Sequence, residues 1–425
     1  MKIKIIGAGI AGLTAAWYLQ KIGKVTLYEK SSRVGGWIET IHQDGFCFER
    51  GPRGFRPMSH GKQTLSLCKA LGLDLIAANG AAKTRFICRN GKLEPFSPKS
   101  LIGGLVRDLF ATRPKKDDET IEEFFGRHIG KKLTAAYLDP LARGIFGGDY
   151  KKLSARSCFP SLWTKRSFVL MKKEKAPAAL YSFRGGMEAL PKAIAERLDA
   201  EIRLDEGIYP NNLNSRNFGC VKAPGLIDRK QPHISNIGSV TIDQSRELSR
   251  QPKSDFSSCL GIDKAEADVV IWAIPQALEC ATLSTVSLGW HHEELAQMGY
   301  GFLVPSSEPE PFYGMTWDSM IFPQQEGKTR VCVMIPGAAS DEELLSIANR
   351  AVKKYTGIEA PADSVFIGRA INAIPQYYLG HHKWVEAVES KLPANHYVIG
   401  SSFRGVGVNE CVADAHRIAS LLGAV

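Results

Sequence analysis

The feature that most constrains this chain is a glycine-rich motif between a predicted strand and a predicted helix. Residues 3–6 form a short β-branched run, the motif Gly7-Ala8-Gly9-Ile10-Ala11-Gly12 follows, and residues 13–21 have the composition of a helix. In this setting Gly7 allows a tight turn, Gly9 lets backbone N–H groups approach a pyrophosphate, and Gly12 lets the helix pack closely on the strand. The motif therefore predicts a Rossmann-like α/β domain whose first helix N-terminus faces the phosphates of a dinucleotide.

An acidic residue follows the second predicted strand of this domain. Residues 24–28 form that strand, and Glu29 comes directly after it. A carboxylate there can accept hydrogen bonds from both ribose hydroxyls of the adenosine half and repels a 2′-phosphate, which argues against NADP. The motif by itself does not separate NAD from FAD.

Two further segments favour FAD. The turn Arg33-Val34-Gly35-Gly36-Trp37 places a basic residue before a double glycine, which is typical of phosphate-facing turns in two-dinucleotide-binding flavoproteins. Near the C-terminus a predicted strand (396–400) runs through a loop (401–407) into a predicted helix that begins at 409. Such a helix start can stabilise the negative charge that develops on a reduced flavin ring. The alternative is an ordinary strand and helix that close the sheet.

Composition limits the class of protein. The chain has 425 residues, of which 44% are hydrophobic, so it can form two or three packed units. A net charge of +10 suits an anionic substrate or an anionic membrane surface, whereas the basic residues lie in short clusters and do not predict nucleic-acid binding. The nine cysteines show no C-x-x-C spacing and favour a reducing, cytoplasmic compartment. Because no run approaches the roughly 18 apolar residues of a spanning helix, a membrane role would have to be peripheral.

The middle of the chain is predicted to be mixed. We expect a helix over 58–75, a hairpin over 84–94 with a type I′ turn at Asn90-Gly91, and helices over 101–110, 120–129 and 131–141. Apolar runs beside basic residues near 101–107 and 168–173 are compatible with a membrane surface, although ordinary packing is favoured. Residues 209–266 have the composition of loops or an insertion, and 267–275 that of a buried strand.

No motif for a metal site or a catalytic nucleophile is present. The chain lacks H-E-x-x-H, Walker A, G-x-S-x-G and zinc-ligand spacings, and the adjacent pairs 291–292 and 381–382 are histidines whose side chains diverge. The sequence therefore predicts no metal and no catalytic side chain, in agreement with chemistry that a cofactor carries.

Several longer stretches occur in a fixed order along nearly the whole chain: 35–39, 49–56, 143–161, 183–191, 299–308, 374–381 and 405–410. Together they resemble the protoporphyrinogen oxidase family, which are FAD-dependent enzymes of late haem synthesis among the amine oxidase-like flavoproteins. The most specific are Gly299-Tyr-Gly-Phe-Leu-Val-Pro305 and Ile374-Pro-Gln-Tyr377.

The resemblance implies an α/β plus α+β architecture of three units. These are a Rossmann-like (two-dinucleotide-binding) FAD domain, a mostly antiparallel-sheet substrate domain, and a helical module that associates with membrane. The FAD domain would take residues 1–57, 183–273 and 384–425, the substrate domain 58–95 and 274–383, and the helical module 96–182. A homodimer and a location on the cytoplasmic face of a membrane are compatible with the resemblance.

The resemblance also implies the site. The matching FAD-binding positions are Gly7, Ala8, Gly9, Ile10, Ala11, Gly12, Glu29, Lys30, Trp37, Gly51, Pro52, Arg53, Gly54, Ile208, Ser401, Val406, Gly407 and Val408. The matching substrate-binding positions are Arg85, Leu141, Gly144, Tyr300, Leu303 and Met334. Arg85 would hold a propionate, for which a guanidinium fork is suited, although an ordinary surface arginine is the alternative.

The implied reaction is a six-electron oxidation of protoporphyrinogen IX, with hydride transfer to FAD and oxygen as the final acceptor. The backbone of Gly144 would lie near the reacting carbon. The sequence departs from the family at Tyr300, where phenylalanine is usual, and over 209–266. Three alternatives stay open: a coproporphyrinogen III oxidase of the same fold, an amine oxidase or carotene desaturase, and a flavin-binding protein without enzymatic activity.

Overall fold

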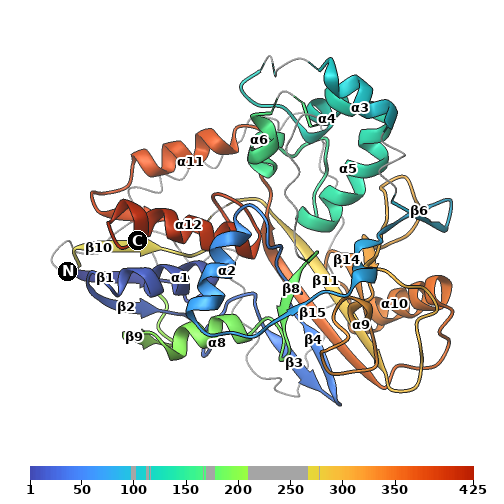
Figure 1. Cartoon of the computed structure of the whole chain (residues 1–425), viewed down its shortest axis with the longest axis horizontal. Coiled ribbons are helices and arrows are strands. Elements are labelled where there is room, and N and C mark those ends of the chain that lie inside the picture. The colour runs from blue at the N-terminus through green and yellow to red at the C-terminus, as the bar shows by residue number, and fades with distance from the viewer. Residues whose placement is uncertain are drawn as a thin grey trace, which may run out of the picture.

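The computed structural model describes residues 1–96, 102–111, 114, 116–165, 167–168, 178–208, 267–276 and 278–425. Two sheets and a group of helices form three neighbouring parts, and the two termini lie close together near the start of β1, the central strand of the first sheet (Figure 1). The predicted loop-rich segment 209–266 lies outside the described residues.

The first sheet is parallel, as the glycine motif predicts. Its strand order is β16-β10-β1-β2-β9, and every neighbouring pair is parallel. The strands are β1 (Lys2–Ile6), β2 (Lys24–Tyr28), β9 (Ala200–Arg203), β10 (Val269–Trp272) and β16 (His396–Val398). Three distant parts of the chain thus supply one sheet.

Helices cover both faces of this sheet. On one face α1 (Ile10–Leu19) packs against α12 (Val408–Leu421) and α8 (Ala189–Glu196), and α12 packs against α2 (Gly61–Ala70). Ile3 and Ile5 of β1 belong to this core, whereas Ile6 faces the opposite core beside α11 (His381–Ser390). Such alternation is the pattern of a strand buried on both sides.

Two predicted boundaries differ from the structure. The helix expected over 58–75 is α2, which ends at Ala70 because Gly72 adopts a left-handed φ of +62°. Its residues Leu67 and Cys68 lie in the core of the first sheet, so α2 packs with the dinucleotide part and not with the second sheet. The helix expected over 131–141 is α5 (Lys131–Phe146), which ends at the left-handed Gly147.

The second sheet is mostly antiparallel, as expected. Its order is β15-β11-β14-β13-β12-β6-β7, and only the β12–β6 pair is parallel. Its strands are β6 (Phe86–Arg89), β7 (Lys92–Pro95), β11 (Cys280–Trp290), β12 (Gly301–Leu303), β13 (Gly314–Thr316), β14 (Thr329–Pro336) and β15 (Ser364–Pro375). The hairpin turn between β6 and β7 has positive φ at Asn90 and Gly91, which confirms the predicted type I′ turn.

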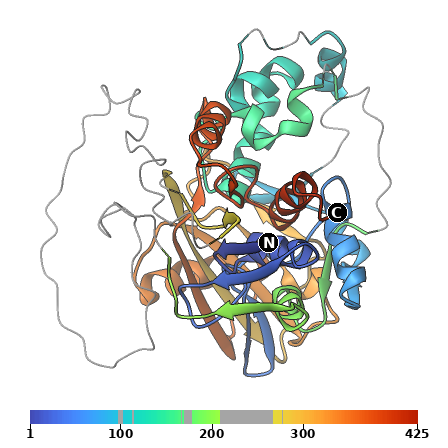
Figure 2. The same ribbon diagram turned by 90° about the vertical axis from the view of Figure 1, so that its left-hand side faces the viewer.

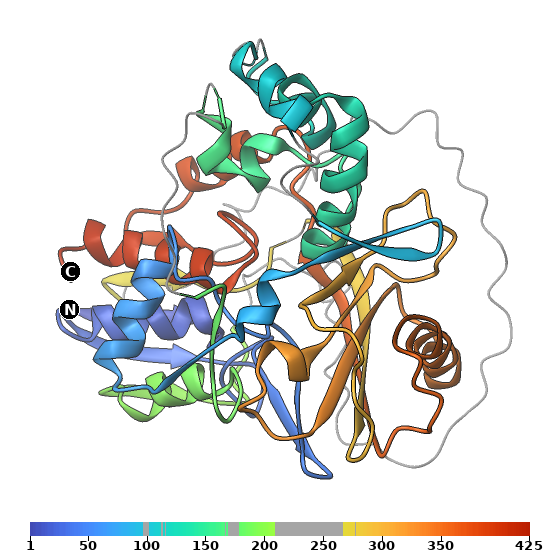
Figure 3. The ribbon, with the colours of Figure 1, turned by 45° about the vertical axis from the view of Figure 1, so that its right-hand side comes forward.

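One face of the second sheet is covered by α10 (Asp341–Thr356), which is seen at one side of the sheet in Figure 3. On the other face, Gly289 of β11 lies against Phe46, and Leu303 of β12 lies against Gly144 of α5. The remaining small elements near it are α9 (Asp318–Ile321), η1 (Gly80–Lys83) and the two-stranded pairs β3 (Thr40–Gln43) with β4 (Phe46–Glu49) and β5 (Leu75–Ala77) with β8 (Tyr181–Phe183).

The helical part lies above both sheets (Figure 2). It contains α3 (Ile102–Leu109), α4 (Ile121–Ile129), α5, α6 (Ala155–Cys158) and α7 (Pro160–Trp163). A capping box fixes the start of α4, because the Thr120 hydroxyl accepts from the Glu123 backbone N–H and the Glu123 side chain accepts in return. No helix in the part of the chain described is long and apolar enough to cross a membrane.

Candidate active site

The glycine motif turns at the carboxyl end of β1. Gly7 has a φ of +102°, and a Cβ there would lie 2.5 Å from the Ala273 carbonyl oxygen. A Cβ on Gly12 would lie 1.9 Å from the Gly7 carbonyl oxygen. Gly9, which precedes α1, has no heavy atom within 4 Å of the corresponding position. Gly7 and Gly12 are therefore required by the protein's own packing, and Gly9 faces open space.

Glu29 connects this loop to the end of β2. Its buried carboxylate accepts from the Ala8 backbone N–H at 2.8 Å and from the Ser31 backbone N–H at 3.0 Å. The Ser31 hydroxyl donates to it as well, at 2.8 Å. The carboxylate is thus held against the glycine loop, while the neighbouring Lys30 is exposed. Ribose binding by Glu29 stays a prediction.

The second glycine turn lies against the first. The Gly35 N–H donates to the Ala8 carbonyl at 2.8 Å, and a Cβ on Gly36 would lie 3.3 Å from the Gly9 Cα. The Arg33 guanidinium donates to the Gly36 carbonyl at 2.6 Å and to Glu39 at 3.1 Å. Arg33 thus holds the turn in shape, a role that the motif alone does not indicate.

The turn from Gly51 through Pro52 to Gly54 packs beside Trp37. A Cβ on Gly51 would lie 2.0 Å from the Trp37 carbonyl oxygen, and Trp37 itself is 42% exposed. The Arg53 side chain points into the protein instead, where its Nε lies 2.9 Å and 3.1 Å from the two carboxylate oxygens of Asp318. Its guanidinium is therefore committed to an internal ion pair.

The C-terminal loop reaches the start of α1. A Cβ on Gly400 would lie 3.7 Å from the Ala11 Cβ, so Ser401 and the residues after it lie close to the glycine motif. Val406 packs toward the helical part, Gly407 is the N-cap of α12, and Val408 begins that helix. Neither α1 nor α12 has a side-chain cap, so their first N–H groups are available to a ligand.

These features fit a dinucleotide. A cradle with room for a pyrophosphate lies at the carboxyl end of the parallel strands. It is formed by the open side of Gly9, the glycine turns around it, and the uncapped starts of α1 and α12. Ile208 is partly buried in the core beside α11, at the end of the described segment, and its contact with an adenine stays a prediction.

Sequence reasoning missed Tyr377 and His381, which support the C-terminal loop. The fully buried Tyr377 hydroxyl donates to the Ser401 carbonyl and accepts from the Gly405 N–H at 3.0 Å. The His381 ring stacks on Tyr377 with centroids 4.0 Å apart, and its Nε2 donates to the Phe403 carbonyl at 3.0 Å. Both residues lie in the stretch 374–381 noted above, but only the fold brings them to residues 401–405.

The position of His381 predicts a pH-dependent stability. Burial lowers its pKa from 6.5 to about 4, with the hydrogen bond to Phe403 acting in the opposite direction. The unfolded chain therefore binds the proton more readily, and stability is retained above pH 6.5 and lost as the pH falls toward 4. We expect this group to cost about 2 kcal/mol between pH 7 and pH 5.

The measurement is urea unfolding of the parent and a His381→Gln variant at both pH values. The two proteins must be compared because acidification also acts on Glu49. Burial raises the pKa of Glu49 to about 7, so its contribution to stability changes with pH in the opposite direction and is present in both proteins. The parent should lose more stability on acidification than the variant does. Equal losses would contradict the assignment.

The substrate positions Leu303 and Met334 lie in one row across the second sheet. Leu303 of β12 pairs with Gly314 of β13, which pairs with Met334 of β14. The next residues along the strands, Phe302, Met315 and Val333, belong to the core beside α10. Because successive side chains alternate between faces, the row of Leu303 and Met334 faces away from α10. Gly314, which lies between these two apolar residues, has no side chain to fill the space between them.

Helix α5 closes over this row. A Cβ on Gly144 would lie 2.7 Å from the Leu303 Cδ2, so α5 and β12 meet at this glycine. Leu141, one turn earlier, is partly buried against the core of the helical part. The structure therefore brings Leu141, Gly144, Leu303 and Met334 to one region, where a helix and a sheet face each other.

Arg85 and Tyr300 lie at one end of that region. The Arg85 Cζ lies 5.0 Å from the centroid of the Tyr300 ring, and the Tyr300 N–H donates to the Thr84 carbonyl at 2.8 Å. Within the described ranges Arg85 makes no ion pair. Burial lowers its pKa, and the nearby charge of Arg56 lowers it further. An unpaired, partly buried guanidinium of this kind is suited to an anionic ligand group.

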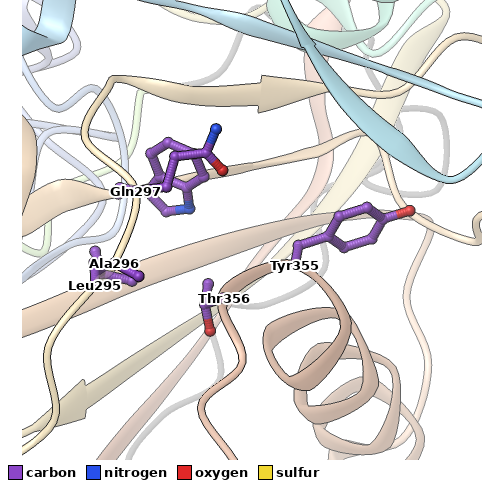
Figure 4. A pocket seen from close by; sticks show the side chains of 6 residues that line it. Leu295, Ala296, Gln297, Tyr355 and Thr356 are labelled. Atoms are coloured by element: carbon purple, nitrogen blue, oxygen red, sulfur yellow. The ribbon is translucent and has the colours of Figure 1, made fainter.

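A cavity of about 120 Å³ lies elsewhere, between α10 and the loop before β12. Its lining includes Leu295, Ala296, Gln297, Tyr355 and Thr356 (Figure 4). None of the expected site residues lines it. In the part of the chain that the structure covers, no three His, Cys, Asp or Glu side chains gather as a metal site requires.

Comparison with known proteins places the chain in a family. The family described as flavin containing amine oxidoreductase matches residues 10–208. The protoporphyrinogen oxidase of Bos taurus is 31% identical over 98% of this chain and 97% of its own length, and that of Homo sapiens is 31% identical over 99% and 98%. The coproporphyrinogen III oxidase of Bacillus subtilis is 26% identical over 96% and 95%.

Solved structures agree on the fold. A crystal structure from Exiguobacterium sp. 255-15 superposes with a TM-score of 0.72 at 21% identity, covering 99% of this chain and 98% of its own. The family model that matches residues 10–208 is described as flavin containing, and a flavin dinucleotide fits the cradle at Gly9. Because two relatives are 31% identical over nearly the whole of both chains, this chain belongs to the protoporphyrinogen oxidase family.

Proposed function

We propose that this chain is an FAD-dependent oxidase that converts protoporphyrinogen IX to protoporphyrin IX, with oxygen as the final acceptor. The observation that carries the proposal is the site between α5 and the second sheet, which combines an apolar row around Gly314 with an unpaired arginine at one end. A flat, apolar macrocycle with acidic side chains matches that combination. The full-length relatives named for this activity support it.

FAD, when bound, supplies the two-electron acceptor for each of three successive oxidations. The protein's own residues would bind and orient the substrate. Leu303 and Met334 would contact the macrocycle, Gly144 would let α5 pack close beside Leu303, and Arg85 would fix the edge that carries a carboxylate. Arg85 directly precedes β6. Tyr300 lies three residues before Leu303, so roughly 10 Å of extended chain separates these two residues. The proposal assigns no general base.

The competing substrate is coproporphyrinogen III, which relatives from Bacillus subtilis and Staphylococcus aureus are named for at lower identity. The deciding experiment supplies each porphyrinogen to the FAD-loaded protein under oxygen and records the appearance of porphyrin fluorescence. Faster turnover of protoporphyrinogen IX supports the proposal, and a large preference for coproporphyrinogen III overturns it. Retained FAD with neither product would indicate a non-enzymatic flavoprotein.

The Arg85→Ala variant should lose mainly substrate affinity. Removing one charge-assisted contact to a carboxylate costs about 1.5–3 kcal/mol, so we expect KM to rise by about tenfold or more while kcat changes less. The measurement is steady-state kinetics with protoporphyrinogen IX. Arg89→Ala is the matched control, because Arg89 lies on the same hairpin and already pairs with Glu94 at 3.1 Å. Parent-like kinetics in Arg85→Ala would refute the assignment.

We also propose peripheral contact with the cytoplasmic face of a membrane through α3 and the residue after it. Val106, Leu109 and Phe110 are exposed there, Phe110 by 82%, and Arg107 lies among them. Such an arrangement suits an anionic lipid surface. Co-sedimentation with vesicles that contain phosphatidylglycerol tests it, and a Phe110→Ser variant should bind them less.

A homodimer stays a prediction.

A further inference from the structure

A second arginine, Arg56, lies close enough to Arg85 for their charges to interact, and its side chain has no partner among the described residues. Two contacts hold its backbone. The Arg56 carbonyl accepts from the Asn409 side-chain amide at 2.9 Å. The same carbonyl oxygen packs so closely on Gly61 that a Cβ on Gly61 would lie 1.8 Å from it. Its side chain is exposed and, among the described residues, makes neither an ion pair nor a hydrogen bond. The residue therefore presents a free guanidinium from a fixed backbone.

The segment that carries Arg56 lies beside Tyr300. Arg53 of that segment pairs with Asp318, and the N–H of Trp317, which precedes Asp318, donates to the Tyr300 carbonyl at 3.0 Å. The electrostatics agree that Arg56 and Arg85 are neighbours. Burial lowers the pKa of Arg85, and the charge of Arg56 is the next cause. Arg53, on the same segment as Arg56, is neutralised by Asp318 at 2.9 Å. Within the part of the chain that the structure describes, two neighbouring positive charges are thus left without a carboxylate, although a third arginine on the same segment has one. Two like charges at close range repel each other, and an anion that binds between them relieves the repulsion.

Tyr300 adds a donor to this cluster. Its ring lies 5.0 Å from the Arg85 Cζ, and its hydroxyl makes no hydrogen bond in the ranges that the structure covers. A phenol O–H and two guanidinium groups supply enough donors for two carboxylates, whereas one guanidinium fork satisfies one.

We propose that Arg56 and the Tyr300 hydroxyl form, beside Arg85, a second carboxylate subsite, so that this end of the region between α5 and the second sheet binds two adjacent carboxylate side chains of a tetrapyrrole. The inference rests on the proposed function and extends it to the substrate's charge. The two unpaired cations match a dicarboxylate edge. A substrate with four carboxylates would have to place its other two outside this cluster.

The test measures binding of protoporphyrin IX, its monomethyl ester and its dimethyl ester to the FAD-loaded protein by fluorescence titration. The variants are Arg56→Gln, Tyr300→Phe and Arg56→Gln with Arg85→Ala. Lys83→Gln is the matched control, since it removes an exposed positive charge two residues from Arg85.

We expect Arg56→Gln to weaken binding of the diacid by about tenfold and to leave binding of the dimethyl ester unchanged. Tyr300→Phe should have the same selectivity with a smaller loss, and the double variant should no longer prefer the diacid to the dimethyl ester. Lys83→Gln should keep the parent's preference.

Equal losses for diacid and dimethyl ester in Arg56→Gln, or no loss for either, would overturn the subsite. An equal loss of the diacid in Lys83→Gln would overturn it too, because a general field would then explain the effect. Failure of the proposed function has a different signature, in which the parent protein oxidises neither porphyrinogen whatever its affinity for the porphyrins.

Discussion

A Gly9→Ala variant should fold like the parent and bind FAD at least about tenfold more weakly. The added methyl group meets no protein atom within 4 Å, so the protein alone does not oppose it. It does occupy the open side of the loop, where the N–H groups at the start of α1 face a pyrophosphate. The measurements are FAD titration of the stripped protein and its thermal midpoint without FAD.

Gly12→Ala separates packing from cofactor binding. Its Cβ would lie 1.9 Å from the Gly7 carbonyl oxygen, a backbone atom, so the loop and α1 must move apart. Overpacking of this kind costs about 1–3 kcal/mol, and we expect a lower thermal midpoint as well as loss of FAD. Gly80→Ala is the control, since that position is also free of neighbours within 4 Å but lies in η1. If Gly9→Ala binds FAD as tightly as the parent does, the cradle has been assigned to the wrong loop.

The second large effect concerns the buried pair of Arg53 and Asp318. Both side chains are mostly buried, at 13% and 8% exposure, and the Thr316 hydroxyl donates to the same carboxylate at 2.7 Å. Burial alone lowers the pKa of Arg53, but the charge of Asp318 more than offsets this and the pKa is raised overall. Asp318→Ala would leave a buried cation unpaired, and we expect a loss of about 3–5 kcal/mol.

Replacing both members should recover much of that loss. A double variant with Arg53→Met and Asp318→Leu leaves no charge to compensate, and such apolar replacements are often neutral. Glu359→Ala is the surface control, because it removes a pair with Lys353 in which both side chains are more than half exposed and should cost less than about 1 kcal/mol. Urea unfolding of the four proteins checks the order. An Asp318→Ala variant as stable as the Glu359→Ala control would contradict the argument.

Local patterns were sufficient for much of the fold. The glycine motif with its flanking strand and helix predicted the parallel sheet, and Asn90-Gly91 predicted the β6–β7 hairpin of the second sheet. Both depend on backbone conformations that few residues other than glycine and asparagine adopt. Helix ends were less predictable. The end of α2 was wrong because Gly72 breaks a pattern that apolar spacing alone would continue.

The site divides in the same way. The sequence predicted that the glycine motif follows the first strand and that Glu29 follows the second, and the structure joins the two through the Ala8 N–H. Their contact with FAD stays a prediction. Cofactor binding at Arg53 stays a prediction, and only the fold pairs its side chain with Asp318, which is 265 positions away. Tyr377 and His381 were missed because their partners lie in the C-terminal loop.

The sequence by itself determined that a dinucleotide loop begins the chain and, through its resemblance, which family the chain joins. The tertiary structure alone decided which charges are neutralised. Arg53, Arg56 and Arg85 look alike in sequence, yet only Arg53 has a carboxylate beside it in the described residues. The physical reason is that electrostatic interaction depends on separation in space and on burial, and the fold sets both by bringing together strands and turns that are far apart along the chain.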